Sequence, residues 1–110
     1  MKISLNIGLN NNPYNHEQIK NLLSNIGTIL NSRQVDSTYI GNIEPTSVII
    51  IDVPFKNNKN LVNWIEDLCK ITTQEAIAVK NDEGFKQLVY NPNFKGEILK
   101  FDENYFVNIV

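Results

Sequence analysis

The segment 46–53 constrains the fold more than any other part of the sequence, because in an extended chain it is aliphatic on both sides. Its side chains divide between two faces, with Val48 and Ile50 on one and Ile49, Ile51 and Val53 on the other. Strands of this kind lie in the interior of a sheet that is covered on both faces. We therefore expect strands on both sides of it and helices over one face.

Four further segments have the pattern of strands. Residues 2–9 alternate strictly between apolar and more polar side chains, which indicates a strand with one buried face. Residues 28–39 are richer in polar side chains and fit a long, irregular edge strand. Residues 75–79 and 85–90 flank a turn signal at 81–84 and are expected to form a β-hairpin.

Two helices are predicted, one from His16 to about residue 26 and one at about 59–70. Each carries apolar side chains at the three- and four-residue spacing that places them on one stripe. Asn15 can cap the first helix, and Gln18 can close a capping box with it. Gly27 follows where a left-handed C-cap is expected.

The predicted order is β-α-β-β-α-β, followed by one added hairpin strand and a C-terminal tail. This order is typical of an α+β fold with a ferredoxin-like split βαβ sheet, in which both helices cover one face and the first and third strands are central. The 110 residues are expected to form a single domain, 1–110, because half the chain is too short to bury an adequate core. The tail carries Phe101, Tyr105 and Phe106 and is expected to pack back on the body.

Composition argues against several functional classes. The net charge is −2, and Lys and Arg are spread along the chain, so no basic surface for nucleic acid is expected. The longest aliphatic run is far shorter than the roughly 20 residues of a membrane span. A single cysteine, Cys69, and an N-terminus without a signal-like segment favour a cytoplasmic protein.

No catalytic or metal-binding set emerges from the sequence, so no cofactor and no metal are expected. His16 is the only histidine, whereas a metal site needs three or four convergent ligands. Cys69 lies at the margin of the apolar stripe of the second helix, which favours core packing over nucleophilic chemistry. Asp36, Glu44 and Asp52 lie on or beside adjacent predicted strands and are interpreted as solvated edge carboxylates rather than as an acid–base pair.

A non-enzymatic protein-binding module is the first functional hypothesis. Only one face of the sheet can meet the two helices, so the second aliphatic face of segment 46–53 needs another cover. We expect an interface at Ile49, Ile51 and Val53, covered by a second copy in a homodimer, by a partner protein or by the aromatic tail. The segment has no aromatic or basic side chain and therefore cannot form an RNA-stacking surface.

A small-ligand-binding sensor or minor enzyme is the alternative hypothesis. The loop between the first strand and the first helix is rich in asparagine and can present backbone N–H groups to a ligand. It lacks a glycine-rich phosphate-binding pattern. A pocket between this loop and the sheet would use Asn10, Asn12, Tyr14 and His16.

Four pieces of the chain resemble small bacterial and mobile-element proteins of unassigned function. They are ISLNIGLN at 3–10, EPT at 44–46, QEAIAV at 74–79 and FDENYF at 101–106. The resemblance implies a shared fold and a phage or mobile-element accessory or defence-related factor. It carries over no catalytic residue.

Overall fold

The computed structural model describes residues 1–39 and 41–98, so the predicted packing of Phe101, Tyr105 and Phe106 lies outside the described residues. The described chain is α+β. Its elements follow in the order β1 (Lys2–Gly8), α1 (His16–Ser24), β2 (Thr28–Tyr39), β3 (Asn42–Asp52), α2 (Asn58–Thr72), β4 (Ala76–Asn81) and β5 (Lys86–Tyr90). Each predicted helix and strand is present, with boundaries shifted by a few residues.

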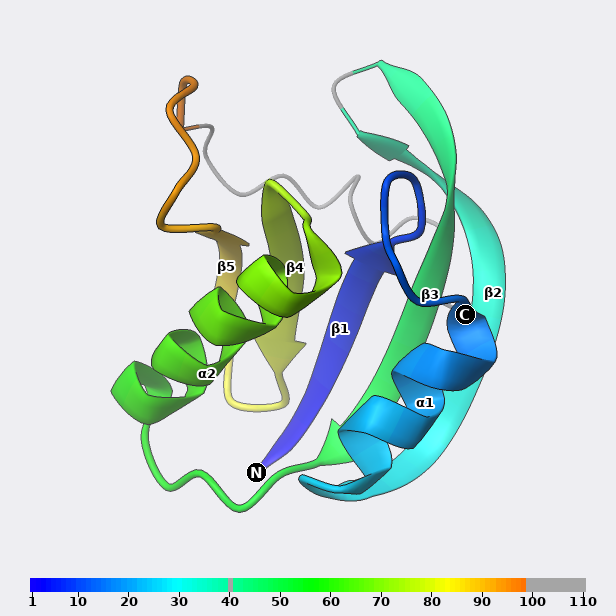
Figure 1. Ribbon diagram of the computed structural model, residues 1–110. Coiled ribbons are helices and arrows are strands. Elements are labelled where there is room, and N and C mark those ends of the chain that lie inside the picture. The colour runs from blue at the N-terminus through cyan, green and yellow to red at the C-terminus, as the bar shows by residue number, and fades with distance from the viewer. Residues whose placement is uncertain (40, 99–110) are drawn as a thin grey trace.

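The strands form one antiparallel sheet in the order β2-β3-β1-β4-β5 (Figure 1). β1 and β3 lie inside the sheet, as their aliphatic side chains predicted. β3 begins at Asn42 rather than at residue 46 and includes Pro45, which has no N–H to donate. The pairing of β1 with β3 ends at Gly8 and Thr46, so Pro45 has no paired residue of β1 beside it. Proline is tolerated at such a position because no N–H is needed there for the sheet.

Both helices cover the same face of the sheet (Figure 1). α1 begins with the predicted capping box, in which Asn15 Oδ1 accepts from the Gln18 N–H and Gln18 Oε1 accepts from the Asn15 N–H, each at 2.9 Å. α2 is capped by Asn57, whose Oδ1 accepts from the Asn60 N–H at 2.8 Å. Neither helix combines the length and the apolar character that crossing a membrane requires.

The role predicted for Gly27 as a left-handed cap is wrong. α1 ends with Asn25 in a right-handed conformation, and Gly27 is not among the glycines with positive φ. A Cβ at Gly27 would instead collide with the backbone carbonyl oxygen of Asp52 at the end of β3. Glycine is needed here because two backbones approach closely.

The core lies between the sheet and the two helices. It joins side chains from one face of the sheet to the apolar stripes of both helices, namely Ile3, Leu5, Ile7, Ile19, Leu23, Ile49, Ile51, Val53, Leu61, Ile65, Leu68, Cys69, Ile77, Val79 and Val89. This arrangement contradicts the predicted interface on β3. Ile49 and Ile51 are 0% exposed and Val53 is 2% exposed, so they are not available to a second copy or to a partner. Strand alternation separates two sets of side chains, but it does not say which set meets the helices.

The opposite face of the sheet is more polar than predicted. Val48 and Ile50 lie on it, and in the register of the sheet they pair with Asn6 and Ser4 of β1. Val48 also pairs with Arg33 of β2. The continuous aliphatic patch that motivated a homodimer through the sheet is therefore interrupted by polar side chains.

Candidate functional site

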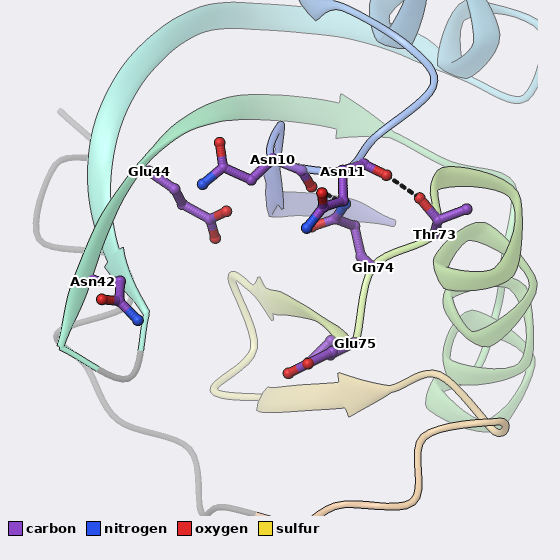
Figure 2. A pocket seen from close by; sticks show the side chains of 8 residues that line it. Asn10, Asn11, Asn42, Glu44, Thr73, Gln74 and Glu75 are labelled. Atoms are coloured by element: carbon purple, nitrogen blue, oxygen red, sulfur yellow. Dashed lines mark hydrogen bonds between the residues drawn. The ribbon is translucent and has the colours of Figure 1, made fainter.

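A polar pocket of ≈ 320 Å³ opens at the end of the sheet where β1 ends, β3 begins and α2 leads into β4 (Figure 2). Its walls come from three separate parts of the chain: Asn10, Asn11, Asn42, Glu44, Thr73, Gln74, Glu75 and Ala76. Figure 2 shows their side chains arranged around a common space. We refer to this group of residues as the polar pocket.

The loop after β1 is shaped by one asparagine side chain. Asn12 Nδ2 donates to the Gly8 carbonyl at 2.9 Å, and Asn12 Oδ1 accepts from the Tyr14 N–H at 2.9 Å. Asn11 has a φ of 57°, a left-handed conformation that asparagine tolerates better than most residues. The closed turn brings Asn10 and Asn11 to the wall of the polar pocket.

The junction of α2 and β4 is tied to this loop by two side chains. Thr73 ends α2 in a left-handed conformation, and its hydroxyl donates to the Asn11 carbonyl (Figure 2). Gln74 Nε2 donates to the carbonyls of Asn10 at 3.0 Å and Thr72 at 3.1 Å. Two segments far apart in the sequence thus form one preorganised wall.

The side chain of Gln74 is held in one direction by the two hydrogen bonds that its Nε2 donates. Gln74 is 8% exposed, and no donor among the described residues reaches its Oε1. A Cβ placed on Gly8 would lie 2.7 Å from Gln74 Oε1 and 2.7 Å from Glu44 Oε1. The two oxygens therefore lie over the same glycine, and β1 accommodates them because Gly8 has no side chain.

The electrostatics of the polar pocket are set by its carboxylates. Burial raises the pKa of Glu44, the backbone N–H of Asn10 lowers it through a hydrogen bond, and the carboxylate of Glu75 raises it. Among residues 1–39 and 41–98, the lining includes no lysine, arginine or histidine. The pocket therefore presents carboxylate and amide oxygens, which favour a ligand with N–H donors or positive charge.

The four residues predicted for a ligand site do not line a common pocket. Asn10 lines the polar pocket, whereas Asn12 closes the turn beside it. Tyr14 packs against the core, and Nδ1 of His16 is hydrogen-bonded to Ser47 Oγ at 2.8 Å. Burial lowers the pKa of His16, with a smaller raising effect from Glu17 and a lowering one from Lys20.

The other lining residues were missed because they come from distant loops. Glu44 was interpreted, with Asp36 and Asp52, as a solvated edge carboxylate, but it is partly buried and lines the polar pocket together with Glu75. Asp52 lies 3.1 Å from the amino group of Met1. The useful signal was Gly8, the only glycine in a strand of larger side chains, since a strand glycine marks a place where something approaches closely.

The remaining candidate for covalent chemistry lies in the core. Cys69 is 0% exposed, and its thiol donates to the Val89 carbonyl at 3.5 Å. Burial raises the pKa of Cys69 to about 12, so the thiol is protonated near neutral pH. Within residues 1–39 and 41–98, no three His, Cys, Asp or Glu side chains are grouped so that they could hold a metal ion.

Comparisons with protein-family models, with curated proteins and with solved structures find no match to this chain. The resemblance to mobile-element proteins therefore stays a prediction. The candidate site is defined by its geometry alone.

Proposed function

We propose that this protein is a non-enzymatic module that binds a small polar molecule in the polar pocket. The observation that carries the proposal is the acceptor Gln74 Oε1, which is held in place by the hydrogen bonds of its own amide nitrogen and has no donor among the described residues. A ligand N–H can donate to this fixed acceptor without the entropic cost of ordering the side chain. The pocket volume lies at the lower end of the range of small-molecule sites.

Binding without turnover fits the composition of the pocket better than catalysis does. Cys69 and His16 carry the side chains best suited to nucleophilic or base chemistry, and neither lines the polar pocket. The thiol of Cys69 faces the core, and the ring of His16 is engaged by Ser47. Among the described residues, the hydroxyl that lines the pocket beside the two carboxylates is that of Thr73, and it donates to the Asn11 carbonyl.

For the fold, we propose the ferredoxin-like arrangement with β5 added as a hairpin strand beside β4. The strand order β2-β3-β1-β4 and the uniform antiparallel pairing support this proposal. Each helix connects two strands that are separated by one other strand in the sheet, α1 between β2 and β1 and α2 between β3 and β4. The polar pocket then lies at one end of the two central strands.

A thermal-shift screen tests the proposed function. The panel contains amino acids, polyamines, nucleosides, sugars and carboxylates, each at millimolar concentration. A ligand at one hundred times its dissociation constant stabilises the folded state by about 2.7 kcal/mol, a rise in Tm on the order of 10 °C for a domain of this size. A panel in which no compound raises Tm would contradict the proposal.

Self-association is a second candidate function, and a different observation favours it. An apolar groove of ≈ 160 Å³ lies between the helices and is lined by Leu22, Leu23, Asn25, Ile26, Trp64, Asp67, Leu68 and Ile71. Ile26 and Ile71 are 40% and 47% exposed at this groove. Two copies that face each other across it would bury these side chains in the symmetric pairing most common among oligomers.

Light scattering tests the homodimer through this groove. The wild type is expected to be dimeric at high micromolar concentration, and Ile71→Asp is expected to be monomeric and still folded, because the residue is half exposed. Ile43→Asp is the matched control, since Ile43 is 73% exposed in β3 and does not line the groove. A monomeric wild type would refute the second candidate.

A further inference from the structure

We propose that the polar pocket selects a small organic cation, a molecule with a primary ammonium or guanidinium group. The inference rests on the proposed function and names the class of ligand. It follows from three properties of the pocket: the charge of its lining, the placement of two acceptor oxygens and its size.

Among the described lining residues, Glu44 supplies a negative charge. Among the described residues, this carboxylate forms no ion pair with a lysine, an arginine or the histidine. Its partner is the backbone N–H of Asn10, and the carboxylate of Glu75 is near enough to act on it electrostatically. A cationic ligand would be attracted by the Glu44 carboxylate, while an anion would be repelled by it.

Two acceptor oxygens converge beside Gly8. Glu44 Oε1 and Gln74 Oε1 each lie 2.7 Å from the point where a Cβ of this glycine would stand. Each approaches the same stretch of β1, and Gln74 is held there by its bonds to Asn10 and Thr72. Ammonium and guanidinium groups carry several N–H donors on one centre and can donate to two such oxygens at once.

The size and composition of the polar pocket disfavour other ligands. Calcium takes six to eight oxygens at roughly 2.3–2.6 Å, a shell much smaller than a hollow of ≈ 320 Å³. In the described part of the chain, Glu44 and Glu75 are the only carboxylates of the lining, and no group of three metal-binding side chains occurs. The described lining residues also include no aromatic side chain on which a nucleobase could stack.

Isothermal titration with matched probes tests the inference. Butylguanidinium and butylammonium are the cationic probes, butylurea is the neutral counterpart of the first, and butyrate and calcium chloride are the anionic and metal arms. The cations are expected to bind at least tenfold more tightly than butylurea, butyrate or calcium. A neutral, anionic or metal probe that binds as tightly as the cations overturns the inference, while the proposed binding function stands.

Two variants locate the effect. Glu44→Gln is expected to weaken binding of butylguanidinium at least tenfold, because it removes the charge and keeps the shape of the side chain. Glu83→Gln is the matched control, since it removes an equal charge from an exposed residue of the β4–β5 turn and is expected to change nothing. A melting curve checks that both variants fold, and undiminished binding by a folded Glu44→Gln variant overturns the inference.

The experiments distinguish failure of the cation inference from failure of the proposed binding function. If none of the probes binds, the inference about organic cations is wrong, and the thermal-shift panel decides independently whether the polar pocket binds a ligand of another class.

Discussion

Glu44 is the residue at which a pH dependence of stability is expected. Burial raises its pKa, Asn10 lowers it and Glu75 raises it, with a net rise above the ordinary value of 4.5. The folded protein therefore keeps the proton to a higher pH than the unfolded chain does. The ionised carboxylate reduces the free energy of unfolding progressively as the pH rises from 4.5 through the raised pKa.

Glu44→Gln removes this cost. The variant is expected to be at least as stable as the wild type near neutral pH, and the difference is expected to vanish below pH 4.5, where both states of the wild type are protonated. Urea unfolding at several pH values measures this difference. A difference that stays constant across the pH range would show that Glu44 does not titrate as described.

Gly8 tests the packing of the polar pocket. In Gly8→Ala the new methyl group lies 2.7 Å from Glu44 Oε1 and Gln74 Oε1, so both side chains must move. We expect a small loss in the free energy of unfolding, about 1 kcal/mol or less, because the atoms met are the ends of side chains that can turn away, together with loss of ligand binding. Gly41→Ala is the control, because no atom lies within 4 Å of a Cβ at this position. The φ of Gly41 is +76°, which disfavours alanine, but this variant should retain ligand binding. Gly8→Ala with wild-type binding would contradict the description of the pocket.

Cys69 tests the interpretation of the sole thiol as a core residue. Since burial raises its pKa to about 12, a thiol reagent at pH 8 is expected to leave the folded protein unmodified and to react fully in denaturant. Mass spectrometry after a timed reaction measures both. Rapid modification of the folded protein would show that the thiol is accessible and reactive.

At the scale of the elements, local patterns predicted most of what is observed. The capping box of Asn15 and Gln18 and the alternation in β1 are local signals, and both are present in the structure. The role of Gly27 was not predictable in this way, because it depends on the backbone of Asp52, which is distant in the sequence. The face of β3 that meets the helices was not predictable for the same reason. Alternation divides the side chains of β3 into two faces, but which face meets the helices depends on distant parts of the chain.

The junction between α1 and β2 is expected to be intolerant of a side chain. In Gly27→Ala the methyl group would collide with the Asp52 carbonyl, and neither backbone can move without disturbing β3. We expect a loss of about 1–3 kcal/mol or more in the free energy of unfolding, measured by urea denaturation. The outcome that would contradict this description is a gain in stability, as expected for a glycine-to-alanine change at an unstrained, open position.

At the scale of the whole molecule, the candidate site was predicted only in part. The first loop was identified and Asn10 lies on the polar pocket, but Thr73, Gln74 and Glu75 reach it through the packing of α2 and β4. Sequence spacing cannot bring together three segments whose meeting point is created by the sheet order. The strand glycine Gly8 was the one local sign of this convergence.

The central claim is that the polar pocket is the place where this protein binds its ligand. Titration of ¹⁵N-labelled protein with butylguanidinium, followed by amide chemical shifts, tests it most directly. We predict that the largest changes occur at Asn10, Asn11, Thr73, Gln74 and Glu75 and that they saturate together. Changes centred on the apolar groove around Ile26 and Ile71, or scattered over the surface without saturation, would contradict it.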